Sequence, residues 1–373
     1  MIGLVVNPVA GVGGPAGLAG SDGGAVQRIA RERGSIPRAS DRAAVALSML
    51  PRGTTVATAA GAMGEDAVRS AGLVPNVVYH PAAGTTADDT RSAVRALVEE
   101  GASLILFAGG DGTARDVLDG LSGGSAATLG IPAGVKMYSA VFAVSPRAAG
   151  AIALAWSEGD LPVDRREVLD IDEHEMRRAR VQPRLFGELA VPVLSGRTQA
   201  RKTPTPASEQ ASAAAAARGA LRVLEPGVSY LVGPGSTMAE LTGQLGLEGS
   251  ALGVDVIRDG RIVTRDASER QLLAAVADGP AKAIVTIIGG QGFLLGRGNQ
   301  QLSAPVVRAI GVDPLIVVAP ESKLVALQGR PLLVDTGDPI LDAELSGYVR
   351  IITGASTSSL YPVRSPEHTE SQS

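Results

Sequence analysis

A short apolar run that ends at a glycine-containing turn and leads into a stretch of helical character recurs along this chain of 373 residues. In the first part of the chain, such runs cover residues 2–6, 54–58, 77–80 and 104–108. Short apolar runs that alternate with helices are typical of buried parallel strands. The pattern therefore predicts an α/β fold whose N-terminal part is a doubly wound parallel sheet.

The second half of the chain repeats this organisation after a different segment. Residues 168–172 alternate apolar and acidic side chains, which predicts a strand, whereas residues 230–232 and 283–288 again precede glycine-rich turns. The length of the chain suits two domains. We expect an N-terminal α/β domain at residues 1–145 and a second domain at 146–350, the latter made of a β-rich segment at 160–197, a loop at 198–219 and α/β units at 220–350.

Two segments contain few apolar side chains that could be buried in a core. Residues 198–219 are rich in Thr, Pro, Ser and Ala and contain almost no large apolar side chain, which predicts a mobile loop. Within it, the alanine run at 213–217 could become helical. Residues 355–373 are rich in Ser, Thr and charged residues, and we expect a disordered tail there.

The composition excludes several classes of function. Aromatic residues make up only 3% of the chain and the net charge is −4, which argues against a nucleic-acid-binding protein. The absence of cysteine excludes disulfides, thiolate nucleophiles and sulfur-bound metal centres. With only three histidines, any metal is expected to be bound by oxygen, as magnesium is.

Neither a signal peptide nor a membrane span is expected. The chain starts without the basic residues and the long apolar stretch of a signal peptide. Its longest apolar tract, residues 137–156, is interrupted by Pro146 and Arg147 and suits a buried helix better than a membrane span. We therefore expect a cytoplasmic protein that does not bind membranes.

The sequence Gly109-Gly110-Asp111-Gly112-Thr113 follows one of the buried apolar runs and precedes a helical stretch. Its glycines allow a tight turn in which the backbone approaches a phosphate closely. Thr113 is expected to cap the following helix, whose free amide groups favour an anion. The turn therefore predicts a phosphate-binding loop at the carboxyl edge of the sheet.

Asp111 is the unusual member of this turn, because a carboxylate repels a phosphate unless it serves a metal or takes a proton. Phosphoryl transfer to an alcohol needs a group that accepts the hydroxyl proton while magnesium screens the charge. A bare Gly-Asp-Gly turn is also explained by its backbone angles alone. Between a buried strand and a helix, the five-residue sequence favours Asp111 as a general base.

The chain resembles a known family. The turn at residues 109–113 is similar to the signature shared by NAD kinases, diacylglycerol and sphingosine kinases and phosphofructokinases. Other segments resemble more narrowly the predicted ATP-NAD kinase group that includes the acetoin catabolism protein X. These segments are residues 7–11, 112–116, 131–136, 289–292 and 296–303, and the resemblance spans most of residues 1–350.

The resemblance implies a transferase that moves the γ-phosphate of ATP, or of polyphosphate, onto a hydroxyl group, with Asp111 as the base and Mg²⁺ accompanying the ATP. In NAD kinases the acceptor is the 2′-OH of the adenosine ribose of NAD, and the product is NADP. Small-molecule nucleotides are then the expected partners. The aliphatic composition and the oligomeric state that the family commonly adopts favour a homo-oligomer.

The chain departs from the family at the segments that select the acceptor. NAD kinases carry an Asn-Glu pair that grips the dinucleotide, and this pair does not occur here. Lipid kinases carry Gly-Thr-Gly-Asn-Asp where residues 134–138 read Gly-Val-Lys-Met-Tyr. Two alternatives therefore stay open, namely a kinase of the same fold that acts on another small polyol, nucleoside or lipid hydroxyl, and a nucleotide-sensing protein without turnover.

Several polar residues near the expected strand ends are candidates for nucleotide binding. Asn7 either binds a phosphate or ribose, which the resemblance favours, or forms the turn before Pro8. Thr86 is a nucleotide contact or a helix cap, and Lys136 neutralises a transferring phosphate or faces solvent. The residues expected to bind nucleotide or phosphate are Asn7, Gly11, Thr86, Gly109, Gly110, Gly112, Thr113 and Lys136.

The second half of the chain supplies candidates for substrate binding. Ser236 and Thr237 follow Gly-Pro-Gly and form a second anion cradle or simply cap a helix. Arg297 has a glycine on each side, which leaves its guanidinium accessible in a loop whose amides suit a purine or ribose edge; an ordinary polar loop is the alternative. The residues expected to bind substrate are Ser236, Thr237, Gly290, Gln291, Arg297, Asn299 and Gln300.

The metal ligands remain open at the level of sequence. Asp170 and Asp172 lie two apart on a predicted strand and face the same side, where they could hold magnesium. Asp335 and Asp338 share a turn, a setting in which Asp is common without any metal. We take Asp170, Asp172 and Asp335 as the candidates.

Overall fold

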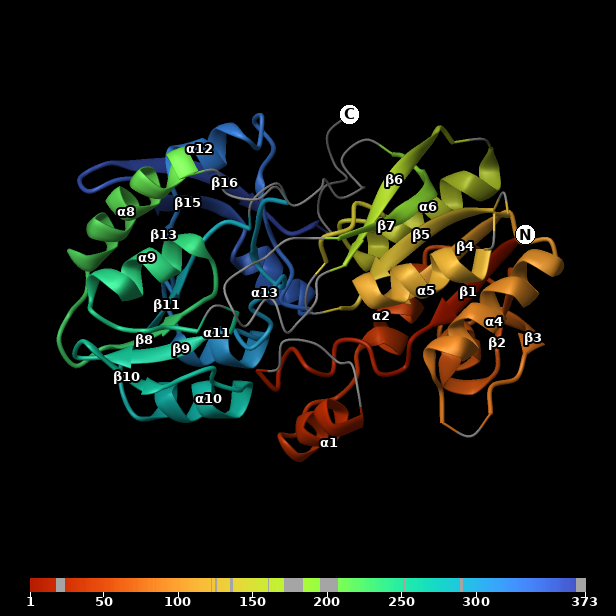
Figure 1. The fold of residues 1–373 in the computed structure, drawn as a ribbon, viewed down its shortest axis with the longest axis horizontal. Coiled ribbons are helices and arrows are strands. Elements are labelled where there is room, and N and C mark those ends of the chain that lie inside the picture. The colour runs from red at the N-terminus through yellow and green to blue at the C-terminus, as the bar shows by residue number, and fades with distance from the viewer. Residues whose placement is uncertain are drawn as a thin grey trace. The chain divides into compact units, whose positions relative to one another are not determined.

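The chain forms two compact units (Figure 1). One contains Met1–Val12 and Ile36–Arg201, and the other contains Gly13–Ser35 and Lys202–Ser373. The structure, a computed structural model, describes residues 1–17, 24–82, 84–121, 123–124, 126–134, 137–159, 161–170, 184–194, 207–250, 252–288 and 291–366.

The first unit is built on a parallel sheet of five strands in the order β3-β2-β1-β4-β5. The strands are β1 (Ile2–Val6), β2 (Thr55–Ala59), β3 (Val74–Tyr79), β4 (Leu104–Gly109) and β5 (Ala127–Pro132). β1, β4 and β5 are buried along their whole length, as their near-continuous apolar sequences predict. The predicted α/β class and the parallel N-terminal sheet are therefore confirmed.

Helices connect these strands and cover the sheet. They are α2 (Ala39–Leu47), η1 (Gly61–Met63), α3 (Glu65–Ser70), α4 (Ala87–Glu99), α5 (Asp111–Leu121) and α6 (Pro146–Glu158). α4 packs against α5, whereas α2 packs against α3 and α6. The strand order turns back between β1 and β4, and right-handed crossovers then put α4 and α5 on the face opposite α2 and α3. The sheet is therefore doubly wound, with its switch point between β1 and β4.

An antiparallel hairpin completes the first unit. It consists of β6 (Val163–Asp170) and β7 (Arg184–Pro192), which lie inside the segment expected to be β-rich. β7 packs on β5, and β6 packs on α5. Because of these contacts the hairpin belongs to the first unit, so the first boundary lies near residue 201 and differs from the one expected at 145.

The second unit is built on a mixed sheet of nine strands in the order β10-β9-β8-β11-β13-β15-β16-β14-β12. β8, β11, β13 and β15 run parallel to one another in its centre. The strands are β8 (Ser229–Val232), β9 (Asp255–Arg258), β10 (Arg261–Thr264), β11 (Ala281–Val285), β12 (Phe293–Leu295), β13 (Leu315–Val318), β14 (Leu332–Val334), β15 (Gly347–Ile352) and β16 (Ser358–Arg364).

Seven helices among the described residues belong to this unit. They are α1 (Gly24–Glu32), α8 (Ala207–Leu221), α9 (Ser236–Gln244), α10 (Glu269–Ala277), α11 (Ala304–Ile310), α12 (Glu321–Val325) and α13 (Pro339–Glu344). No helix in the described part of the chain is both long enough and apolar enough to cross a membrane.

Two expectations about unstructured segments are wrong. Residues 207–219, expected within a mobile loop, belong to α8, whose Ala216, Ala217 and Ala220 pack in a core cluster with Tyr230 and Val232. Small alanine side chains let this helix lie close to the sheet, so it buries surface without any large apolar residue. The tail expected at 355–373 contains β16, because its residues pair in antiparallel fashion with β15.

Candidate active site

The carboxyl ends of β1 and β4 lie side by side at the switch point of the first unit, and Asn7 links them. Its backbone N–H donates to Ala108 O at 3.0 Å, and its side-chain Nδ2 donates to Thr113 Oγ1 at 3.0 Å. The Asn7 Oδ1 atom accepts from the backbone N–H of Val9 at 3.2 Å. Asn7 therefore fastens the loop after β1 to the first turn of α5.

Thr113 does not cap α5, contrary to the expectation from sequence. The helix begins at Asp111, and the first backbone bond runs from Ala114 N to Gly110 O at 3.0 Å. Thr113 lies inside the first turn with 3% of its surface exposed, and its hydroxyl receives the bond from Asn7. A side chain at Gly109 would collide with that hydroxyl, since an added Cβ would stand 2.3 Å from Thr113 Oγ1.

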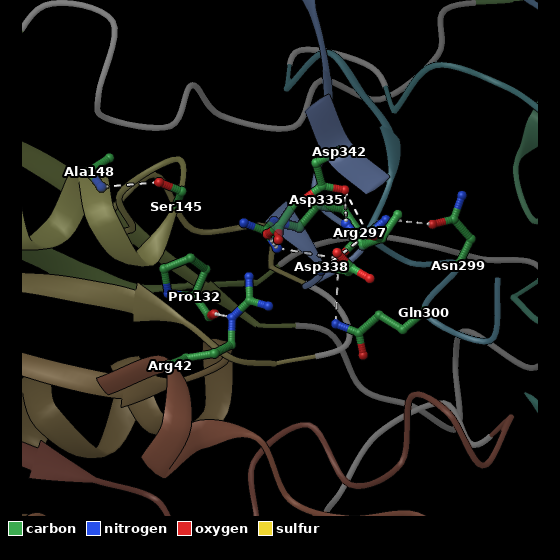
Figure 2. Close-up of polar contacts among 12 residues, drawn as sticks. Arg42, Pro132, Ser145, Ala148, Arg297, Asn299, Gln300, Asp335, Asp338 and Asp342 are labelled. Carbon is green, nitrogen blue, oxygen red and sulfur yellow. Dashed lines mark hydrogen bonds and ion pairs between the residues drawn. The ribbon is translucent and has the colours of Figure 1, made fainter. Parts of the chain in front are cut away.

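Glycines bring three loops of the first unit into backbone contact. Gly11 has a φ of +80° and its Cβ position lies 2.3 Å from Ala133 O, so only glycine fits there. A Cβ on Gly134 would stand 2.6 Å from Gly110 Cα. The loops after β1, β4 and β5 are thus pressed together, and Arg42 of α2 secures the last one by donating to Pro132 O at 2.6 Å (Figure 2).

Asp111 is buried at the centre of these loops, with 5% of its surface exposed. Its carboxylate accepts hydrogen bonds from the backbone N–H groups of Tyr138, at 2.6 Å, and Ser139, at 3.1 Å. Burial raises the pKa of Asp111 to about 7, although hydrogen bonds from Ser139 and Tyr138 oppose the increase. The negative charge of Asp170 raises this pKa further. A carboxyl group with such a pKa can both lose and accept a proton near neutral pH.

Of the two metal candidates in the first unit, the structure describes only Asp170. The carboxylate of Asp170 forms an ion pair of 2.9 Å with Arg115 of α5, and Asp172 lies outside the described residues. Among the residues that the structure describes, no group of three or more acidic or histidine side chains could hold a metal ion. Lys136 also lies outside the described residues.

Thr86 caps a helix, which is the simpler of its two predicted roles. Its backbone N–H and its hydroxyl both donate to Asp89 Oδ2 at 2.8 Å, and the pair forms a capping box at the start of α4. Tyr79 donates its hydroxyl to the other Asp89 oxygen at 2.8 Å. The hydroxyl of Thr86 is therefore engaged by the protein itself.

In the second unit, the loops after β8 and β11 meet a lysine. Ser236 and Thr237 are the first two residues of α9, and Thr237 is fully buried. The Lys323 Nζ atom donates to Ile287 O at 3.1 Å, to Thr286 Oγ1 at 3.3 Å and to Thr237 Oγ1 at 3.4 Å. These positions follow three neighbouring parallel strands, so a positive charge stands at the carboxyl edge of this sheet.

Lys323 was missed by the sequence analysis. It lies on α12, a helix of five residues that no glycine turn precedes. The available signal was its position after the buried apolar run of β13, directly beyond Ala319 and Pro320.

Arg297 is not accessible, and the prediction that its fork is exposed is wrong. It is 3% exposed, and its Nη1 forms an ion pair of 3.0 Å with Asp335 Oδ2 (Figure 2). Its guanidinium lies 4.5 Å from the ring centroid of Phe293. A buried charge needs such a partner. Asp335, a metal candidate in the sequence, is thus the counter-ion of Arg297 and joins the loop after β12 to the end of β14.

The amide side chains near Arg297 hold their own loop. Asn299 Nδ2 donates to Leu294 O at 2.7 Å, and Asn299 Oδ1 accepts from Gly296 N at 3.1 Å. Gln300 Nε2 donates to Gly296 O at 3.5 Å. Gln291 is buried, and its backbone N–H bonds to Ile288 O at 3.2 Å, whereas Gly290 lies outside the described residues.

Comparison with known families agrees with this arrangement. The ATP-NAD kinase N-terminal domain matches residues 2–161, and the ATP-NAD kinase C-terminal domain matches residues 225–363. No curated protein and no solved structure matches the chain. The two domains indicate a kinase that binds nucleotides and transfers phosphate to an NAD-like substrate. The family implies ATP and NAD as substrates, typically with a divalent metal. With both domains matched in order along the chain, the protein belongs to the ATP-NAD kinase-like family.

Proposed function

We propose that the protein phosphorylates NAD at the 2′-OH of its adenosine ribose, with the γ-phosphate of ATP as donor, NADP as product and Asp111 as the general base. The observation that carries the proposal is the placement of Asp111. It is a buried carboxyl group at the topological switch point of a doubly wound sheet, and its pKa is raised to about 7. Ligands of such sheets bind at this edge.

Transfer of a phosphoryl group to a hydroxyl requires one proton acceptor. The acceptor hydroxyl gives its proton to the Asp111 carboxylate while its oxygen forms a bond to the γ-phosphorus. The bond from that phosphorus to the β,γ-bridging oxygen breaks, and ADP leaves. Each carboxylate oxygen of Asp111 accepts one backbone hydrogen bond and carries two lone pairs, which supports a role in taking the proton.

A divalent metal would be carried mainly by the ATP. The described residues include no cluster of three acidic or histidine side chains, and both Asp170 and Asp335 are paired with arginines. This donor set does not fit a metal cage made of protein side chains alone. Magnesium commonly keeps several waters and binds through substrate phosphates.

We also propose two places for the phosphates of the substrates. In the first unit, the N–H groups at the start of α5 and the neighbouring Asn7 and Gly11 suit an anion. Lys136, which lies outside the described residues, is proposed for the same role from the sequence alone. In the second unit, the ammonium group of Lys323 beside Thr237 supports the anion cradle expected at Ser236 and Thr237. For Arg297, Asn299 and Gln300, contacts within the protein favour a role in holding the loop.

A second function is supported by a specific departure. The chain lacks the Asn-Glu pair with which NAD kinases grip the dinucleotide. This favours, as the alternative, a kinase of the same fold that acts on another small polyol, nucleoside or lipid hydroxyl. A nucleotide sensor without turnover is disfavoured, because it has no need of a buried base such as Asp111.

A phosphate-transfer assay tests the proposal. The purified protein is incubated with Mg²⁺ and either ATP or polyphosphate, and with NAD, NADH or a panel of alcohols and nucleosides. We expect NADP from NAD. Transfer to another hydroxyl but to no NAD form would replace the proposed acceptor by the alternative one. Absence of transfer to every acceptor, with ATP binding intact, would favour the sensor.

A further inference from the structure

The hydroxyl of Ser139 connects the segment that holds Asp111 to the end of β6. Ser139 is fully buried, and its backbone N–H donates to Asp111 Oδ1 at 3.1 Å. Its Oγ donates to Leu169 O at 2.9 Å and accepts from Leu169 N at 3.0 Å. A single residue therefore touches both the proposed base and the backbone of a strand 30 positions away along the chain.

The segment around Ser139 has no regular structure to hold it in place. Residues 137–139 belong to no helix or strand among the described elements, although their two amides must face the carboxylate of Asp111. The two hydrogen bonds between Ser139 and Leu169 attach this segment to β6, because Leu169 lies on that strand, which is paired with β7. The backbone N–H of Ala140 adds a bond of 3.4 Å to Glu167 O. Fixing both amides in this way avoids an entropic cost each time that the carboxylate is ionised.

A second connection closes a ring around Asp111. Arg115 lies on the same helix as Asp111, and it pairs at 2.9 Å with Asp170, the residue after Leu169. The ring runs from Asp111 through Ser139 and Leu169 to Asp170 and returns through Arg115. The segment that contains Ser139 and the helix that carries Asp111 are thus both attached to the last two residues of β6.

We propose that Ser139 is a positioning residue for the proposed phosphoryl transfer, whose hydroxyl, by bonding Leu169 twice, keeps the amides of Tyr138 and Ser139 aimed at the carboxylate of Asp111. This inference rests on the proposed function only for its effect on turnover. The geometry it describes is a property of the folded protein.

The electrostatics give the direction of the effect. Burial raises the pKa of Asp111. The hydroxyl of Ser139 lowers this pKa, as do the backbone N–H groups of Tyr138 and Ser139, and the charge of Asp170 raises it. Arg115, the partner of Asp170, lies on the same helix, and burial raises the pKa of the Tyr138 phenol so that it stays neutral. Removal of the Ser139 hydroxyl takes away its own lowering effect and loosens the two amides, whereas burial and Asp170 stay in place, so the pKa of Asp111 rises.

The test compares Ser139→Ala with a matched control. Ser145→Ala also removes a buried serine hydroxyl, one that accepts from Ala148 N at 3.0 Å and caps α6 (Figure 2). The Asp111 carboxyl is titrated by ¹³C NMR in protein labelled at aspartate, with the resonance identified by its loss in Asp111→Asn. We expect Ser139→Ala to raise the pKa of Asp111 by about one unit and Ser145→Ala to leave it unchanged.

Kinetics give the second readout. For Ser139→Ala we expect kcat at neutral pH to fall about tenfold, with the acidic limb of its pH profile moved upward and the KM for ATP changed less than about twofold. Ser139→Cys, which keeps the size of the side chain but bonds weakly, is the second variant if the alanine protein does not fold, and it should shift the pKa in the same direction.

The outcomes separate the two proposals. An Asp111 pKa that Ser139→Ala and Ser139→Cys leave at the wild-type value overturns the positioning role, even in an enzyme that phosphorylates NAD. A raised pKa in a protein that transfers no phosphate to NAD supports the positioning role and overturns the proposed acceptor instead.

Discussion

The carboxylate of Asp111 accepts a hydrogen bond of 2.6 Å from the backbone N–H of Tyr138. The two residues are 27 positions apart, one at the start of α5 and the other beyond the end of β5. The bond brings a backbone dipole to a carboxyl group that burial would otherwise keep largely protonated. The proposed base is therefore held between two neighbouring strand ends of the first unit.

Replacing Asp111 by asparagine keeps its size and removes its ability to take a proton. We expect Asp111→Asn to lower kcat by about two to four orders of magnitude, while the Kd for ATP measured by calorimetry stays within about threefold of the wild-type value. A variant that retained the wild-type kcat would remove Asp111 from the role of base. Asp119→Asn, an exposed carboxylate later on the same helix, is the matched control.

The activity should depend on pH through the ionisation of Asp111. Because a general base must be deprotonated, and because burial raises the pKa of Asp111 to about 7, kcat should increase with pH up to about 7 and then level off. Below that pH, the rate should fall about tenfold for each unit. A pH profile of kcat under saturating substrates checks this. A profile flat between about pH 5 and 8 would contradict the raised pKa.

The ion pair between Arg297 and Asp335 should matter for stability. Both residues are buried, at 3% and 7% side-chain exposure, so Arg297→Ala leaves a carboxylate without its partner and should cost about 3–5 kcal/mol in the free energy of unfolding. Arg308→Ala, which breaks exposed pairs with Asp338 and Glu344, should cost less than about 1 kcal/mol. Urea unfolding measures both.

If the Arg297→Ala protein were as stable as the wild type and its substrate KM were raised about tenfold or more, Arg297 would regain its predicted role in substrate binding. The double variant Arg297→Met with Asp335→Leu should recover part of the lost stability, because it leaves no charge buried alone.

Lys323 should contribute to the binding of a phosphate group. Its ammonium reaches the hydroxyls of Thr237 and Thr286 at the ends of two neighbouring parallel strands. We expect Lys323→Ala to weaken the binding of pyrophosphate, followed by calorimetry, about tenfold. Lys282→Ala, which removes a partly exposed lysine paired with Asp313, should leave this affinity unchanged. Equal affinities in the two variants would limit Lys323 to holding the loops together.

Local features of the sequence were sufficient to predict the first sheet and the position of the glycine turn around Asp111. Each of β1 and β4 is a continuous apolar run, and such a run is buried on both faces wherever it lies. The turn at residues 109–113 follows directly, so its place at the carboxyl edge of the sheet needs no knowledge of distant residues.

Predictions from local sequence failed where the burial or the role of a small or polar side chain was inferred from its residue type alone. Ala216 and Ala217 form the buried face of α8, although alanine predicts little burial in a window without larger residues. Thr113 has the chemistry of a helix cap, yet its hydroxyl binds Asn7, which is 106 positions away. In both cases the partner is distant in the chain, and no pattern within a short window contains it.

The sequence by itself determined the α/β class, the five-residue turn around Asp111 and the family, because these depend on residue type and spacing along one stretch of chain. Only the tertiary structure decided that Tyr138 and Ser139 hold Asp111, that Asp335 neutralises Arg297 and that Lys323 meets Thr237. Those pairs form because strand order brings together loops that are far apart in the chain, and a buried charge must find its partner wherever the fold places one.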